Sequence, residues 1–278
     1  MTALDRRLDK RNAVLRYGPE NAGAPTLVVD RTHPFFFDHP LDHIPGLLLL
    51  EGAVQAAQDV AAVPCFVEEI YARFVKFALF EAPVTLEVSQ QQDGARHRVE
   101  VTLVQSGRVR ARITVGLAPV CAPRTTVAPR DDLRPCAGDL LNKRRAENVL
   151  ITTPVIDGET VGAALLPISP DCLLADSEST VHPLYLLEAF MQLQRFLNAT
   201  RDGAARVRDI LTGIRITQEA PLCGVGDVTL RGGLAMRTRA DGQVARGADL
   251  LIGERPFGHC SIETARLQSR VKLHSSRG

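Results

Sequence analysis

The segment Leu47-Leu-Leu-Leu-Glu51-Gly-Ala-Val-Gln55 recurs further along the chain as Leu184-Tyr-Leu-Leu-Glu188-Ala-Phe-Met-Gln192, at an offset of 137 (188 − 51). Both copies place a Gln four residues after a Glu. The tripeptide Glu81-Ala-Pro83 recurs as Glu219-Ala-Pro221 at an offset of 138 (219 − 81). Two separate motifs at nearly one offset indicate an internal duplication.

The repeated segment predicts a helix that is buried on every side. Residues 47–60 and 184–197 are apolar nearly all round, and strand-like stretches follow each of them. A sheet that curls around one long buried helix is the hotdog fold. We therefore predict an α+β chain of two tandem hotdog folds, with the two sheets paired edge to edge as a pseudo-dimer. The expected strands are residues 70–80, 83–89, 98–105 and 108–117, followed by 206–217, 228–234, 244–251 and 258–265.

The segment between the two copies reads as a linker. Residues 118–135 are rich in Pro and polar residues, which favours an extended connection. We predict a first hotdog unit over residues 1–120, a linker over 121–139 and a second unit over 140–278.

Composition narrows the class of protein. The 278 residues are 45% hydrophobic and can bury two cores, and the formal net charge of +1 is too small to hold a nucleic acid by charge alone. No apolar run is long enough to span a membrane, and the first residues lack the apolar core of a signal peptide. We expect a cytoplasmic protein whose six scattered cysteines remain thiols.

One motif resembles a known family. Residues 33–51 read His33-Pro-Phe-Phe-Phe-Asp38-His39-Pro-Leu-Asp42-His43-Ile-Pro-Gly46-Leu-Leu-Leu-Leu-Glu51, and the string DHPxDHxPGxLLLE is similar to the A-factor biosynthesis (AfsA-type) tandem hotdog family. Residues 181–189 resemble the plainer repeat of that family. The resemblance implies transfer of a 3-ketoacyl group onto the hydroxyl of dihydroxyacetone phosphate in making butyrolactone signals.

The chain departs from this family at one position in each unit. Family members carry an Arg three residues after the helix Glu, where this chain has Val54 and Met191. The departure predicts that an anchor for an anionic co-substrate is missing from both units.

The same motif resembles, more distantly, the 3-hydroxyacyl-carrier-protein dehydratases of fatty acid synthesis. These enzymes have a His-bearing loop, a Pro-Gly pair and a helix with Glu and Gln, and Pro45-Gly46 to Gln55 fits that spacing. His39 stands two residues nearer to the Gly than the dehydratase His does.

The residue types of the motif suit acid–base chemistry on a thioester. His39 is the candidate base, and a carboxylate on the apolar helix, Glu51 or Glu188, is the candidate acid, because burial should raise its pKa. The N–H of Gly46, at the positive end of a helix, is the candidate donor to the thioester carbonyl oxygen. Four residues are expected to support this site: Asp42 (or Asp38) by capping the helix or fixing a His tautomer, His43 by bracing the loop, and Gln55 and Gln192 by facing the same side as the glutamates.

Pairing of the units determines which residues share a site. In paired hotdogs, the resemblance implies that the His loop of one unit faces the helix Glu of the other. We therefore expect one competent site, formed by His39 and Glu188, and a degenerate site at Glu51; a site within the first unit, His39 with Glu51, is the second choice.

Some of these residues also have a structural interpretation. The glutamates could instead bind loop amides, and His182 is interpreted as structural. The basic runs 142–145 and 108–112 are interpreted as solvated charge, with docking of an acidic carrier protein as the minor alternative. Pro residues interrupt the histidine cluster, so no metal is predicted.

The leading hypothesis for function is therefore a hydro-lyase. It would dehydrate a 3-hydroxyacyl thioester in polyketide or fatty-acid-like specialised metabolism. The alternatives are a butyrolactone-type acyltransferase and a non-catalytic acyl-binding protein. No cofactor is predicted. The substrate is expected on the phosphopantetheine of an acyl carrier protein or on coenzyme A, the chain is expected to form a pseudo-dimer by itself, and a further homodimer is compatible with this.

Overall fold

The computed structural model describes residues 9–18, 24–61, 65–120, 132–169, 180–201, 209–235 and 243–266, together with 130, 172, 174 and 237–238. Most of the predicted linker, residues 121–129 and 131, lies outside these ranges, so the domain boundaries stay a prediction. No helix of the described residues is both long and apolar enough to cross a membrane.

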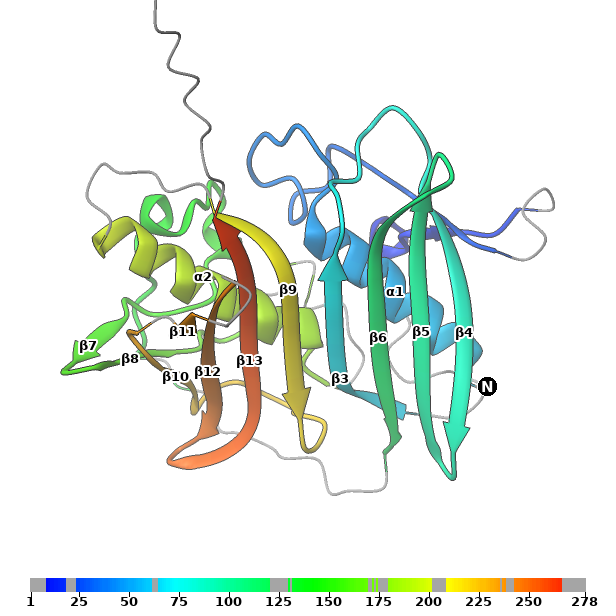
Figure 1. Ribbon diagram of the computed structural model, residues 1–278. Coiled ribbons are helices and arrows are strands. Elements are labelled where there is room, and N and C mark those ends of the chain that lie inside the picture. Colours follow the sequence, from blue (N-terminus) through cyan, green and yellow to red (C-terminus); the bar gives the residue numbers. More distant parts are fainter. Residues whose placement is uncertain are drawn as a thin grey trace, which may run out of the picture.

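Each half of the chain has one long helix followed by antiparallel strands, as the duplication predicts (Figure 1). The first unit contains η1 (Lys10–Asn12), β1 (Leu15–Arg16), β2 (Thr26–Leu27), α1 (Gly46–Val60), β3 (Cys65–Phe74), β4 (Thr85–Asp93), β5 (Arg96–Gln105) and β6 (Arg108–Pro119). The second contains η3 (Gly138–Leu141), η4 (Ala146–Asn148), β7 (Val155–Asp157), β8 (Thr160–Ala164), α2 (Pro183–Arg201), β9 (Asp209–Gln218), β10 (Val228–Gly233), β11 (Arg237–Thr238), β12 (Val244–Ile252) and β13 (Arg255–Arg266).

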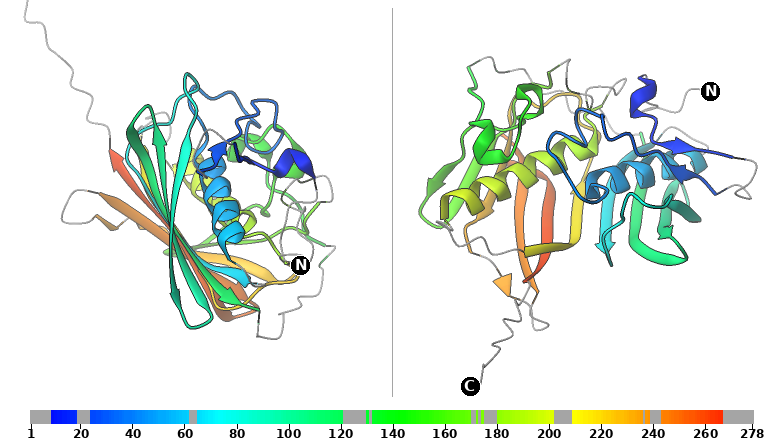
Figure 2. Two further views of the ribbon diagram at one scale, coloured as in Figure 1. Left: turned by 90° about the vertical axis from the view of Figure 1, so that its right-hand side faces the viewer. Right: turned by 90° about the horizontal axis from the view of Figure 1, so that it is seen from above.

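In the part of the chain that the structure describes, the two units share one sheet of 13 strands. Its order is β1-β2-β4-β5-β6-β3-β9-β13-β12-β10-β8-β7, with β11 paired to β12. The units meet where β3 pairs antiparallel with β9, with Ile70 opposite Ile216. Both helices lie on the same face of this sheet (Figure 2). The edge-to-edge pairing that the sequence predicts is therefore present.

Burial follows the sequence pattern. Side chains along β5 alternate between buried and outward-facing positions, with Val99, Val101 and Leu103 on the buried side. The helix α1 is buried from Leu48 to Ala57 except at Gln55, and α2 buries Leu184 to Phe190 completely. An all-round apolar helix is stable only where other elements cover it, which the sheet and the segments preceding each helix do.

One predicted strand is shorter at its end than expected. The strand predicted over residues 70–80 ends at Phe74. Beyond it, the N–H groups of Val75 and Lys76 both donate to the Arg110 carbonyl, and the Gln105 side chain bonds the backbone of Leu79. These contacts replace a strand ladder. The five short strands β1, β2, β7, β8 and β11 were not predicted, because two to five residues carry too little periodicity.

Candidate functional site

A cavity of about 160 Å³ lies between the two units. The first unit contributes the loop before α1, the start of α1 and the end of β3, and the second contributes α2, β9 and the turn after η3. We call it the interunit cavity. Its polar lining residues are His39, His43, Lys143, Glu188 and Arg195, and its apolar lining includes Phe35, Phe74, Met191 and Leu211.

His39 and Glu188 share this cavity, and Glu51 is not among the residues that line it. This is the cross-unit arrangement that the sequence analysis preferred; the catalytic roles of the two residues stay a prediction. The His39 loop is held by the second unit, because Asp38 Oδ2 accepts a hydrogen bond from Arg144 N at 3.1 Å and Asn148 Nδ2 donates to the Pro34 carbonyl at 2.9 Å.

The electrostatics of His39 favour its neutral form. The side chain is half-buried, and its Nδ1 has no hydrogen-bond partner among the described residues. Burial lowers the pKa of His39 below the usual 6.5, and the nearby Arg195 and Lys143 lower it further. A neutral imidazole at pH 7 is able to accept a proton, so the geometry is compatible with a general base.

The surroundings of Glu188 favour its ionised form, which corrects the expectation that its pKa would be raised. Its Oε1 lies 2.7 Å from Lys143 Nζ and 3.0 Å from Arg195 Nη1. Burial by itself would raise the pKa of Glu188, but the charges of Lys143 and Arg195 and the hydrogen bonds from Lys143 and Gln192 together lower it. Such a group is a poor proton donor near neutral pH.

Lys143 was interpreted as part of a solvated basic run, and this was wrong. Its side chain is only 3% exposed and points at Glu188. The preceding Asn142 has the left-handed φ of 54°, and a Cβ at Gly138 would lie 2.8 Å from the Lys143 carbonyl oxygen. The turn that directs Lys143 inward therefore depends on a glycine at 138 and on an Asn, which tolerates that backbone conformation.

Arg195 was also missed, although the sequence carries a signal for it. Position 191, three residues after Glu188, is Met, but position 195 lies seven residues after Glu188 and shares its helix face. Arg195 uses Nη1 on Glu188, and the rest of its guanidinium makes no hydrogen bond with the described residues. The equivalent position after Glu51 is Gln58, so only the second unit supplies this cation.

Gly46 is the first residue of α1, as predicted, with Pro45 before it. The first intrahelical bonds are donated by Leu48 and Leu49 to the Pro45 carbonyl, so the N–H groups of Gly46 and Leu47 are not used within the helix. Gly46 lines the interunit cavity and packs against Phe74. A positive helix end therefore borders the cavity.

Glu51 faces a histidine of the other unit rather than His39. His182 Nε2 lies 3.0 Å from Glu51 Oε2, and both side chains are 2% exposed. The N–H of Leu184 donates to His182 Nδ1 at 3.0 Å, so this nitrogen is unprotonated and the ring proton is on Nε2, facing Glu51. His182 thus caps α2 and contacts Glu51, which fits its structural interpretation.

Replacing Glu51 with Gln is therefore expected to reduce turnover much less than replacing Glu188 with Gln. The Gln side chain can keep the close contact with His182 Nε2, and Glu51 does not line the cavity that holds His39. The measurement is kcat/KM for both variants under one set of conditions. An equal loss in the two would show that the Glu51 pair belongs to the reactive site.

Gln55 and Gln192 occupy equivalent positions and hold equivalent segments. Gln55 Oε1 accepts from Val14 N at 3.0 Å and its Nε2 donates to the Asn12 carbonyl and to Glu51 Oε1, each at 2.6 Å. Gln192 Oε1 accepts from Leu150 N at 2.9 Å, and its Nε2 donates to the Asn148 carbonyl at 2.7 Å and to Glu188 Oε1 at 3.2 Å. Each Gln thus hydrogen-bonds the Glu one turn earlier and the backbone of the segment that precedes its helix.

We expect Gln192→Leu to lower the free energy of unfolding by about 2–4 kcal/mol, because it leaves the buried Leu150 N–H and Asn148 carbonyl unpaired. Gln55→Leu is the matched control. It removes the two equivalent bonds, to Val14 N and the Asn12 carbonyl, from a side chain that is half-buried where Gln192 is fully buried, and should cost less. Urea unfolding measures both; a larger loss for Gln55→Leu would contradict this account.

The remaining predicted residues lie at the edge of the site. His43 Nδ1 contacts Asp42 Oδ1 at 2.6 Å, and its ring packs against Phe77. Asp42 therefore orients His43, which is compatible with its predicted role in fixing a His tautomer. Neither Asp38 nor Asp42 caps α1, which has no side-chain cap. Among the described residues, no group of three or more His, Cys, Asp or Glu side chains is placed to hold a metal ion.

Comparison with known proteins agrees with the motif. Residues 7–120 match the A-factor biosynthesis hotdog domain. A stretch of 64 residues is 45% identical to a Streptomyces coelicolor protein named 2-oxo-3-(phosphooxy)propyl 3-oxoalkanoate synthase, covering 23% of this chain and 20% of that protein. A Streptomyces virginiae protein of the same name is 37% identical over 79 residues, covering 27% of each. The chain thus matches only about a quarter of the length of these relatives.

Solved structures support the fold over nearly the whole chain. The dehydratase domain of a mycocerosic acid synthase-like polyketide synthase superposes with a TM-score of 0.55 at 17% identity, covering 95% of this chain and 98% of the other. The acyl-CoA thioesterase II TesB2 of Mycobacterium marinum gives 0.52 at 11% identity, covering 94% and 98%. The tandem hotdog fold and the resemblance to the A-factor biosynthesis family are confirmed.

Proposed function

Because residues 7–120 match the A-factor biosynthesis hotdog domain, we propose that this chain transfers an acyl group from a thioester to the hydroxyl of an anionic acceptor. One observation carries the proposal. The cavity that holds His39 also holds an ionised Glu188 clamped by Lys143 and Arg195. The cavity therefore contains a proton acceptor and two cations, and its carboxyl group is not in the protonated form that could donate a proton.

The reaction requires a base, an oxyanion donor and a group that positions the acceptor. His39 removes the proton from the acceptor hydroxyl, whose oxygen attacks the thioester carbonyl carbon. The N–H groups at the start of α1 stabilise the negative charge that develops on the carbonyl oxygen. The carbon–sulfur bond then breaks, and the thiolate takes the proton back from the His39 imidazolium. No other group needs to be protonated at the outset.

Arg195 supports an anionic acceptor. Its Nε and Nη2 are unpaired among the described residues and belong to a side chain that is 29% exposed at the cavity. A guanidinium with free donors recognises phosphate well. The names of the Streptomyces relatives describe an ester of a 3-oxoalkanoate with a phosphorylated hydroxyketone, which agrees with a 3-ketoacyl thioester and dihydroxyacetone phosphate as the substrates.

Dehydration, the function that the sequence favoured, requires a protonated group beside the departing hydroxyl. The lowered pKa of Glu188 makes it unsuited to that role. The two reactions are separated by incubating the purified chain either with a 3-ketoacyl thioester and dihydroxyacetone phosphate or with a 3-hydroxyacyl thioester alone. Ester formation supports the proposal. Formation of an enoyl thioester instead, or turnover of neither substrate, would overturn it.

A substitution tests the acceptor site directly. We expect Arg195→Gln to raise the KM for the phosphorylated acceptor by about 10- to 100-fold, the size of one lost charge-assisted hydrogen bond, and to change the KM for the thioester less. Arg195→Lys keeps the charge without the planar donor pair, so it should raise the KM for the phosphorylated acceptor by less than Arg195→Gln does. Equal effects on both KM values would place Arg195 at the thioester instead.

A further inference from the structure

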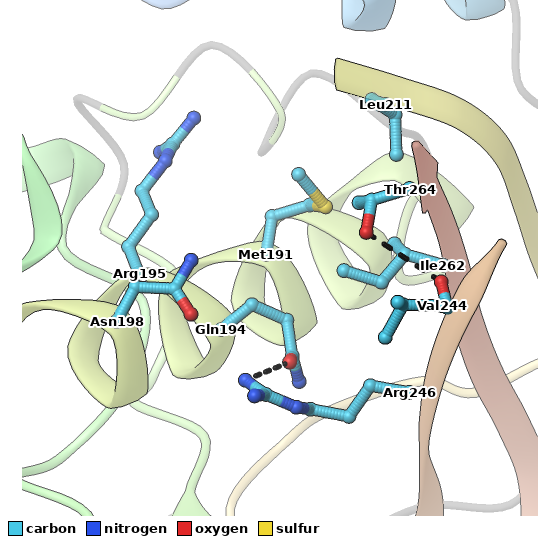
Figure 3. Close-up of a pocket in the computed structure, with 9 residues that line it drawn as sticks. All are labelled: Met191, Gln194, Arg195, Asn198, Leu211, Val244, Arg246, Ile262 and Thr264. Atoms are coloured by element: carbon cyan, nitrogen blue, oxygen red, sulfur yellow. Dashed lines mark hydrogen bonds between the residues drawn. The ribbon is translucent and has the colours of Figure 1, made fainter. Parts of the chain in front are cut away.

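A second cavity, of about 140 Å³, lies between α2 and the strands β9, β12 and β13 (Figure 3). We call it the inner cavity. Its walls are largely apolar, with Met191, Leu211, Val244 and Ile262 among them, and Gln194 and Arg246 form a polar end. None of the proposed reaction steps takes place in this cavity.

The inner cavity adjoins the interunit cavity. Met191, Arg195 and Leu211 line both, so the two spaces lie on either side of these three side chains. Met is unbranched and adaptable, and it can move aside for a chain that passes between the two cavities. A cavity of about 150 Å³ is known to hold a benzene ring, so the inner cavity has room for roughly six carbons.

The polar end offers a hydrogen-bond donor that has no partner among the described residues. Arg246 Nη1 lies 2.9 Å from Gln194 Oε1. A guanidinium only donates, so the Gln194 atom that faces it is the carbonyl oxygen, and the NH₂ group of the amide points elsewhere. Gln194 is 4% exposed and makes no other hydrogen bond with the described residues. Figure 3 shows this amide between α2 and the Arg246 side chain.

We propose that the inner cavity binds the distal end of the acyl chain and selects chains that carry an acceptor oxygen there, such as a keto group. The inference rests on the proposed acyl-thioester function and adds the substrate class. A chain that fills the cavity closes this N–H off from water, which is unfavourable unless an acceptor oxygen on the ligand takes its hydrogen bond. A plain hydrocarbon end fills the same volume and leaves the donor unsatisfied.

The test measures binding and requires no turnover. Pantetheine S-alkyl thioethers with chains of six, eight and ten carbons are compared with the same chains carrying a keto group at the penultimate carbon. Isothermal titration calorimetry on the full chain gives each Kd. For the chain length that reaches Gln194, we expect the keto form to bind about 5- to 10-fold more tightly than its plain counterpart.

Two variants locate the effect. Gln194→Glu keeps an acceptor for Arg246 and removes the N–H donor, so the ratio of the two Kd values should fall to one or reverse. Val244→Phe fills the inner cavity, and we expect it to weaken the longest chain relative to the shortest. These ratios do not depend on how far either variant alters stability.

The outcomes separate this inference from the proposed function. Binding of plain and keto chains with equal affinity at every length, or a keto preference that survives Gln194→Glu, would overturn the inference and leave acyl transfer intact. Failure of every thioether to bind would overturn both, because a chain that does not hold an acyl-pantetheine group cannot act on one.

Discussion

Glu188→Gln is expected to lower the free energy of unfolding by about 3–5 kcal/mol and to abolish turnover. Glu188 is fully buried and Lys143 is nearly so, with 2.7 Å between Oε1 and Nζ. Removing the carboxylate leaves an ammonium group in an apolar setting beside Phe35, without the anion that offsets its desolvation. Arg195, which is partly exposed, can turn to solvent; Lys143 cannot. Urea unfolding followed by circular dichroism measures the change.

The matched experiment removes both members of the pair. Lys143→Met combined with Glu188→Gln should recover part of the stability, because no charge is then left buried without a partner. Glu51→Gln is the second control, since Glu51 faces a neutral His182 and its replacement leaves no buried cation. If Glu188→Gln costs no more than Glu51→Gln, the buried charge pair does not hold this part of the molecule together.

Ionised Glu188 also gives stability a defined pH dependence. Its pKa in the folded chain is below the usual 4.5, so the stability that it contributes is fully present above pH 4.5 and is lost as the pH falls through the lower, folded-state pKa. The pKa of His39 is likewise lowered from 6.5, so protonation of His39 opposes folding as the pH falls below 6.5. Both groups act in the same direction. Unfolding curves collected downward from pH 7 should therefore shift steadily to lower urea concentrations.

The fold could be predicted because its signal is periodic and repeated. The apolar helix containing Glu51 reappears around Glu188, and a helix apolar on all sides leaves few arrangements other than one wrapped by a sheet. The short segments before each helix were missed. Asn12 and Asn148 occupy equivalent positions in them, each bonded through its backbone carbonyl to a helix Gln, but single polar residues at such spacing do not stand out.

Only the site residues that belong to a recognisable motif could be predicted from the sequence. His39, Gly46 and Glu188 came from motifs, and the structure places all three at one cavity. Lys143 lies far from these in sequence, in a basic run that resembles solvated charge, and only the turn at Gly138 and Asn142 directs it inward. Its position reverses the expected pKa shift of Glu188, which is why a sound argument from burial alone gave the wrong protonation state.

His39→Ala is expected to reduce kcat/KM by about 10²- to 10⁴-fold, the usual contribution of a general base. The fold should persist, because His39 Nδ1 makes no hydrogen bond with the described residues and the side chain is only half-buried. His43→Ala is the matched control. His43 lines the same cavity, but it is paired with Asp42 near the surface, and we expect a smaller loss.

The pH profile identifies the base more sharply than the loss of rate. If neutral His39 accepts the proton, kcat/KM rises with pH through the His39 pKa, which lies below 6.5 because of burial and of the charges on Arg195 and Lys143. Arg195→Gln removes one of these charges, so the acid limb of the profile should move up toward 6.5 even as acceptor binding weakens. A structural His39 would leave the limb where it was. Two results together would assign the proton transfer to another group: an acid limb of the pH profile that does not move in Arg195→Gln, and full activity in His39→Ala.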